Sequence, residues 1–235
     1  MLSLKVGILL NVCKGMLMIV IPLAVLLSIL EIYVFCPEFY KQEFQKQNAV
    51  EKIGIQESDL DRIVHKMFRY LKNKDADMNI QVSIQGKQVE AFGDREKRHM
   101  RDVKDLFQKG FFIRNAAALI GIFLFFLLWR ISPDIRRDIL QSCIGASFIA
   151  VLTVILLIAA VYSDFYTYFV YFHEIFFSND MWILDPQRDL LIQLLPLTFF
   201  MNITIRIVGW FGGLMSILGF LSYWLWLRRK RAKPS

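Results

Sequence analysis

The sequence predicts a mainly α-helical integral membrane protein with four transmembrane helices and a small extracytoplasmic α+β domain. Hydrophobic residues make up 56% of the 235 residues, a content too high for an ordinary soluble protein. Four apolar stretches reach the roughly 20 residues that a helix needs to cross the hydrocarbon core of a bilayer. Basic residues gather beside alternate ends of these stretches, which indicates that both termini are cytoplasmic.

Hydropathy and charge divide the chain into nine segments. We predict a cytoplasmic N-terminus (1–14), a first span (15–35), an extracytoplasmic subdomain (36–110), a second span (111–129), a cytoplasmic loop (130–138), a third span (139–161), an extracytoplasmic interfacial loop (162–206), a fourth span (207–227) and a cytoplasmic basic tail (228–235).

The basic character of the chain follows from this topology. The predicted cytoplasmic parts hold ten basic residues, Lys233 of the tail among them, and two acidic ones, so they carry a net charge of +8. The whole chain has a formal charge of +7. Attraction to anionic membrane lipids therefore accounts for the basic balance, and nucleic-acid binding is not needed to explain it.

The predicted subdomain at 36–110 has a balanced surface, with 15 basic and 13 acidic residues. A helix is predicted from about Ser58 to Asn73, because its apolar residues recur at helical spacing. Alternating residues at 78–84 and 89–92 around Gln85-Gly86-Lys87 predict a short hairpin. A further helix at 95–108 is predicted to lead directly into the second span.

The predicted loop at 162–206 is strongly aromatic. Nine of the twenty residues from Ser163 to Trp182 are Phe, Tyr or Trp. Such rings favour the boundary between water and hydrocarbon, so this stretch is predicted to lie in the outer interface. Asp185-Pro186 is typical of a helix start, and Pro196 is predicted to close that short helix.

Three histidines, His65, His99 and His173, all fall in segments predicted to lie outside. Imidazole titrates near neutral pH and is the commonest general acid or base. A solvated surface residue is the simpler interpretation of His65. His173 lies among aromatic residues, where an unpartnered polar group is costly. Its His-Glu pair lacks the second histidine of a zinc-protease motif, because position 177 is Phe.

His99 precedes Asp102 by one helical turn, so the carboxylate could accept a hydrogen bond from the ring and select its tautomer. An ordinary surface pair is the alternative interpretation.

Two runs resemble the lipoprotein intramolecular transacylase family of Gram-positive bacteria. One is Phe172 to Pro186 (FHEIFFSNDMWILDP), and the other is Glu96 to Val103 (EKRHMRDV). The resemblance covers essentially the whole chain in span order and loop size. It implies an enzyme of the cell membrane that moves the sn-2 acyl chain of a diacylglyceryl lipoprotein to the α-amino group of the N-terminal cysteine. The product is lyso-form lipoprotein.

By motif, the resemblance implies His99 and His173 as the two catalytic residues, at the extracytoplasmic face and without a cofactor or metal. One imidazole would take the proton of the amine, and the other would protonate the departing glycerol oxygen. Proximity to the motifs suggests supporting or substrate-positioning roles for Asp102, Glu174, Asn179, Asp180 and Trp182. Arg206 is a candidate contact for a lipid headgroup or carbonyl.

Two other classes of function make different predictions. A transporter would place several ionisable groups within its spans, whereas only Glu31 lies clearly within one here. A membrane-anchored binding or sensory protein would use the subdomain at 36–110, and its histidines would then be dispensable.

Overall fold

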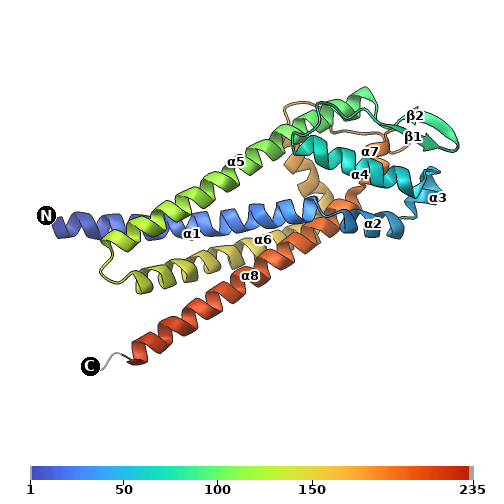
Figure 1. Cartoon of the computed structure of the whole chain (residues 1–235). Coiled ribbons are helices and arrows are strands. Elements are labelled where there is room, and N and C mark those ends of the chain that lie inside the picture. Colours follow the sequence, from blue (N-terminus) through green and yellow to red (C-terminus); the bar gives the residue numbers. More distant parts are fainter. Residues whose placement is uncertain (1, 233–235) are drawn as a thin grey trace. The chain divides into compact units, whose positions relative to one another are not determined.

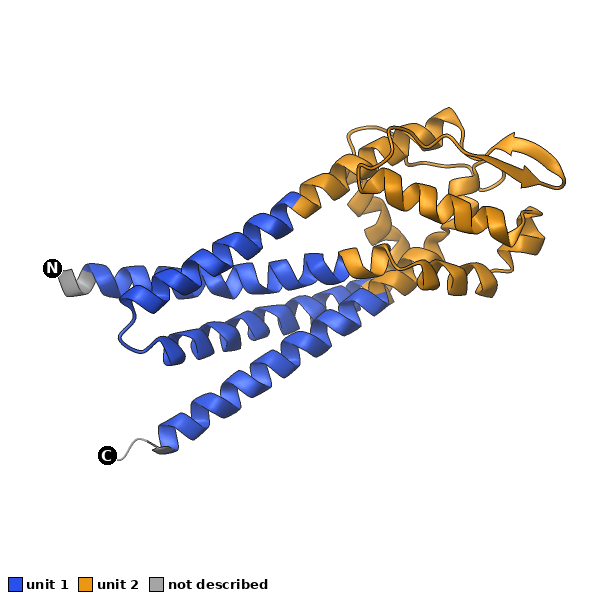
Figure 2. Cartoon of the chain, viewed as in Figure 1, with its two compact units in different colours: residues 1–30, 112–160, 205–235 blue, residues 31–111, 161–204 orange. Residues whose placement is uncertain are grey.

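The structure is a computed structural model that describes residues 2–232, and Lys233 of the predicted basic tail lies outside them. The elements in chain order are α1 (Leu2–Val34), α2 (Pro37–Lys46), α3 (Ala49–Ile53), α4 (Glu57–Leu71), β1 (Gln81–Ile84), β2 (Lys87–Glu90), α5 (Asp94–Ile131), α6 (Ile135–Phe176), α7 (Leu190–Leu194) and α8 (Leu197–Ala232) (Figure 1). The chain divides into two compact units (Figure 2). Unit 1 holds residues 1–30, 112–160 and 205–235, and unit 2 holds residues 31–111 and 161–204.

Four helices, α1, α5, α6 and α8, are long and apolar enough to cross a membrane. This confirms the prediction of a mainly helical fold with four helices that can span a membrane. Roughly 20 residues suffice to cross the hydrocarbon core, and all four helices are longer than that, so each extends beyond its apolar stretch. The first turns of α5, for example, are rich in charged residues and precede its apolar stretch.

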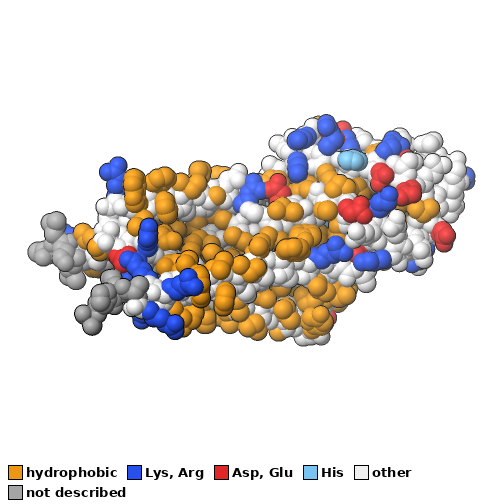
Figure 3. Space-filling model, turned by 60° about the horizontal axis from the view of Figure 1, so that its bottom comes forward, with side chains coloured by type: hydrophobic (Ala, Val, Ile, Leu, Met, Phe, Trp, Pro, Cys, Tyr) orange, Lys and Arg blue, Asp and Glu red, His pale blue; other side chains and the backbone are white. Residues whose placement is uncertain are grey.

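Unit 1 exposes large hydrophobic side chains along its helices (Figure 3). Aromatic and aliphatic residues that are more than half exposed include Phe112, Leu119, Ile122, Phe123, Phe148, Leu156 and Phe220. A contiguous apolar surface of this kind would be unfavourable in water. Lipid is therefore the solvent of this unit, which makes the protein a multi-pass membrane protein.

Small residues bring the helices of unit 1 close together. A Cβ atom added at Gly145 of α6 would lie 2.5 Å from Sδ of Met18 on α1. One added at Gly219 of α8 would lie 2.7 Å from Cβ of Ser147 on α6. In lipid, where burial adds little to helix association, such close packing supplies much of the attraction between helices.

The core of unit 2 is built on one face of α4. The apolar residues of the predicted helix, Leu60, Ile63, Val64, Met67, Phe68 and Leu71, are all buried. Beside this helix, β1 and β2 pair antiparallel and confirm the predicted hairpin. Gln85 and Gly86 join the strands with φ of 50° and 76°, the left-handed conformation that tight hairpin turns require.

Residues 162–206 contain more helix than their sequence predicts. Helix α6 is interrupted at Asp164, whose backbone is non-helical, and then continues to Phe176. The Asp164 carboxylate accepts a hydrogen bond from the Thr167 N–H at 3.2 Å, which is the geometry of an N-cap. A new helical segment, residues 165–176, therefore starts here.

The predicted start of the short helix at Asp185-Pro186 is wrong. Helix α7 begins at Leu190 with Asp189 at its N-cap position, and Pro196 follows it as predicted. Asp185 instead accepts a hydrogen bond from the Gln187 N–H at 2.9 Å within a turn. Asp-Pro is compatible with both a helix start and a turn, and the turn is what forms.

Candidate active site

Unit 2 brings His99 and His173 together. His99 lies on α5 and His173 on the last turns of α6, and their ring centroids are 5.9 Å apart. Both side chains are buried, with 8% and 7% of their surface exposed. Two imidazoles at this separation can exchange protons with two different atoms of one reacting group.

A hydrogen bond selects the tautomer of His173. Its Nδ1 lies 2.7 Å from the Phe169 carbonyl oxygen, four residues earlier in the helix. A carbonyl oxygen can only accept, so Nδ1 carries the ring proton and Nε2 keeps its lone pair. His173 is thereby prepared to take a proton at Nε2.

The buried ring of His99 differs from that of His173 in the hydrogen bonding of Nδ1. Its Nδ1 is shielded from solvent and has no hydrogen-bond partner among the residues that the structure describes. A buried polar nitrogen without a partner is costly, and such groups in native proteins often mark a site that a ligand completes.

Both imidazoles are neutral at pH 7. They lie outside the predicted spans at 111–129 and 139–161. Burial, together with the repulsion of a charged His173 and against the attraction of Asp102, lowers the pKa of His99 to about 4. Burial also lowers the pKa of His173, although the bond to the Phe169 carbonyl opposes this shift. Neutral rings can act as bases without first losing a proton.

Aromatic rings enclose the pair. The Trp182 ring lies 4.8 Å from the His173 ring at an angle of 32°, and Phe169 lies 4.3 Å from it. Phe177 packs against both His99 and His173, at 5.3 and 5.5 Å. These rings exclude water, which strengthens every polar interaction inside the site.

Asp102 has a different partner from the one predicted. No hydrogen bond joins it to His99 in the described part of the chain. Its Oδ2 instead accepts a hydrogen bond from Nδ2 of Asn179 at 3.0 Å. The bond ties α5 to the segment that follows α6. Both residues were candidates from the sequence, but their pairing was not predicted.

Not all of the remaining predicted residues lie beside the histidine pair. Trp182 is beside His173, and the backbone carbonyl of Asp180 accepts a hydrogen bond from Arg95. Glu174 is exposed, because it follows His173 directly in the helix and points about 100° away from it. Arg206 belongs to the part of α8 in unit 1, outside the unit that holds the histidines.

Three residues of the site were missed by the sequence analysis. Phe169 and Phe177 lie four residues before and after His173, so a helical interpretation of this aromatic stretch would have placed them on one face with it. Glu96, three residues before His99, is 2% exposed and accepts hydrogen bonds from two backbone N–H groups. Burial raises its pKa, against the effect of those two bonds.

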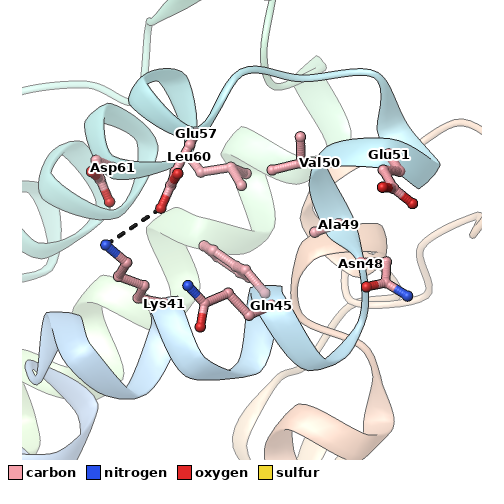
Figure 4. A pocket seen from close by; sticks show the side chains of 10 residues that line it. Lys41, Gln45, Asn48, Ala49, Val50, Glu51, Glu57, Leu60 and Asp61 are labelled. Atoms are coloured by element: carbon pink, nitrogen blue, oxygen red, sulfur yellow. Dashed lines mark ion pairs between the residues drawn. The ribbon is translucent and has the colours of Figure 1, made fainter.

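A cavity of about 240 Å³ lies elsewhere in unit 2, among α2, α3 and α4 (Figure 4). Phe44, Ala49 and Leu60 are buried apolar residues of its lining, and Nζ of Lys41, also in the lining, is 3.4 Å from Oε1 of Glu57. This ion pair neutralises the one basic group of the lining. No histidine lines the cavity, which is separate from the candidate site.

Comparisons with known proteins agree with this fold. The structure is similar to a crystal structure of the membrane-integral lipoprotein intramolecular transacylase Lit from Bacillus cereus, with a TM-score of 0.81 and 21% identity over 97% of this chain and 100% of that one. Two further structures of that protein, in which one histidine is replaced by arginine or by alanine, give TM-scores of 0.78 and 0.76 at 19% and 20% identity. They cover 99% of this chain and 98% and 99% of theirs.

A comparison with curated proteins finds no match. The family model of the lipoprotein intramolecular transacylase Lit, however, matches residues 15–200, and both candidate histidines lie within that range. The chain therefore belongs to the lipoprotein intramolecular transacylase Lit family.

Proposed function

We propose that this protein transfers the sn-2 acyl chain of a diacylglyceryl lipoprotein from the glycerol oxygen to the α-amino group of the N-terminal cysteine. The reaction forms one C–N bond and breaks one C–O bond, and the product is lyso-form lipoprotein. Membership of the family supports an acyltransferase. The observation that carries the proposed mechanism is the pairing of two buried, neutral imidazoles.

His173 is the proposed base. As the neutral amine attacks the ester carbonyl, its nitrogen becomes acidic and Nε2 of His173 takes a proton. His99 relays this proton to the departing glycerol oxygen: one of its ring nitrogens accepts a proton from His173 as the other donates its own. The pair therefore ends the reaction unchanged, and no cofactor takes part.

The surroundings support both charged species of this path. The face of Trp182 would stabilise the imidazolium that forms on His173. The tetrahedral oxyanion needs hydrogen-bond donors. Asn179 is a candidate, because its amide has a second hydrogen besides the one directed at Asp102. Amine and ester belong to one molecule, so holding them in contact removes much of the entropic barrier.

We further propose that both termini are cytoplasmic and that the histidine pair acts at the extracytoplasmic face. The concentration of basic residues at 1–14, 130–138 and 228–235 supports this orientation. In such a topology the site lies at the depth where the acyl chains and the N-terminus of a lipoprotein meet.

The test replaces each histidine and examines a host lipoprotein. His99→Ala and His173→Ala are each expected to abolish formation of N-acyl S-monoacylglyceryl cysteine, and His65→Ala on the exposed face of α4 is the control. Substrate and product are isomers, so the N-terminal lipopeptide must be fragmented in the mass spectrometer. Wild-type product from both site variants would overturn the proposal and favour a binding or sensory role.

A further inference from the structure

The carboxylate of Glu96 accepts hydrogen bonds from backbone N–H groups at the starts of two helices. One oxygen accepts a hydrogen bond from the Gly93 N–H at 2.6 Å, and the other from the Leu191 N–H at 2.7 Å. Gly93 directly precedes α5, and Leu191 lies in the first turn of α7. The first N–H groups of a helix have no partner within it, so Glu96 satisfies one such donor at each start.

The segment 177–191 runs from the end of α6 to the first turn of α7 and covers the histidine pair. Near its beginning, Phe177 packs against His99. Further along, Trp182 packs against His173. The segment ends at the Leu191 N–H that Glu96 holds. Its first end is attached to α6, where the Phe177 N–H donates to the His173 carbonyl at 2.8 Å.

Two exposed polar contacts also join this segment to α5. They are the bond from Asn179 to Asp102 and the bond from Arg95 to the Asp180 carbonyl. Water competes for exposed groups, so such bonds contribute little net stability. All three bonds involve a charged side chain, and the bond from Leu191 to Glu96 is the buried one, so water competes least with it.

We propose that Glu96 is a positioning residue that holds the segment 177–191, and with it Trp182, against the two catalytic histidines. Glu96 acts through backbone N–H groups and contacts no reacting atom. The inference rests on the proposed function for its kinetic consequence only. Its structural consequence, the anchoring of the segment, is independent of that function.

Glu96→Gln is the informative variant, because it keeps the shape of the side chain. An amide nitrogen cannot accept a hydrogen bond, so one of the two N–H groups loses its partner. We expect kcat to fall roughly tenfold while KM changes less than about twofold, since orientation is lost and not binding. Amide hydrogen exchange of residues 177–191 should become faster, whereas exchange in α4 should not change.

Glu90→Gln is the matched control. This carboxylate also accepts a backbone hydrogen bond, from Ile80 at 3.1 Å, and it pairs with Lys97 at 2.8 Å. It lies on β2, and its contacts are with Ile80, Gln81 and Lys97. The control should keep wild-type kcat and wild-type exchange in the segment 177–191.

The possible results distinguish the positioning role of Glu96 from the proposed transacylase function. Wild-type kcat and exchange in Glu96→Gln, or a lower melting temperature with wild-type kcat, would overturn the positioning role alone. Full activity of His99→Ala and His173→Ala would overturn the function and leave the exchange prediction standing. If no Glu96 variant folds, the wild-type protein provides the test, because rapid exchange of the Leu191 amide would refute the anchor.

Discussion

The centroids of the His99 and His173 imidazole rings are 5.9 Å apart, although the residues belong to different helices. Neither ring is solvated, and among the residues that the structure describes neither is hydrogen-bonded to a carboxylate. The site therefore differs from a catalytic triad, in which an acidic residue orients the base. Here a backbone carbonyl orients one imidazole, and packed aromatic rings surround both.

The first prediction concerns Trp182. Trp182→Ala should lower kcat/KM roughly tenfold, because a cation over an aromatic face gains about 1–2 kcal/mol when it is desolvated. Trp182→Phe keeps an aromatic face beside His173 and should stay within about threefold of wild type. Equal losses in both variants would show that the ring face does not stabilise a charged His173.

The second prediction is a pH dependence of stability. The folded protein holds the pKa of His99 near 4, whereas an unfolded histidine titrates near 6.5. Between these values the unfolded chain binds the extra proton, so the free energy of unfolding falls as the pH drops, by up to roughly 1.4 kcal/mol per pH unit. His173 contributes in the same direction.

Thermal unfolding of the solubilised protein, from pH 7 down to about 4.5, measures this effect. His99→Gln should flatten the dependence, while His65→Gln, on the exposed face of α4, should not. An unchanged slope in His99→Gln would mean that His99 titrates normally in the folded protein.

The third prediction tests the bond between Asp102 and Asn179. Asp102→Ala should lower kcat/KM by roughly threefold to tenfold, because it releases the contact between α5 and the segment 177–191. Asn179→Ala should cost at least as much, because it also removes the candidate oxyanion donor. The double variant should be no worse than the more damaging single one. Additive losses would show that the two side chains act separately.

The fourth prediction compares two glycines of α8. Gly219→Ala should destabilise unit 1 by about 1–3 kcal/mol, because the new Cβ would lie 2.7 Å from Cβ of Ser147. Gly213→Ala places its Cβ where no atom lies within 4 Å, so it should be neutral or slightly stabilising. Thermal unfolding in one detergent compares them, and equal melting temperatures would contradict the close helix contact.

The fifth prediction concerns the break in α6. Asp164→Ala removes the N-cap of the segment 165–176 and should cost about 1 kcal/mol, whereas Asp164→Ser should retain most of the stability. Because this segment carries His173, activity should fall with the cap and recover with Ser. Wild-type activity in Asp164→Ala would show that the helical segment is oriented by its packing alone.

Features that depend on residues close together in the sequence were predicted correctly more often than features that depend on distant ones. Hydropathy depends only on neighbouring residues, so the four spans were predictable. The same holds for the amphipathic helix α4 and for the hairpin around Gln85 and Gly86. The helical segment at 165–176 was not predicted, because rings that favour an interface also form the packed face of a helix, and the capping Asp164 was overlooked.

The sequence by itself determined that the chain is a membrane protein of this family, because apolar length, charge distribution and two local motifs carry that information. Only the tertiary structure decided that Asp102 pairs with Asn179, that the Phe169 carbonyl selects the tautomer of His173, and that Glu96 joins α5 to α7. The bonds of Asp102 and Glu96 connect residues far apart in the chain, and their geometry exists only after the helices have packed. The bond of His173 is local, but it required a helix that the composition of this stretch did not reveal.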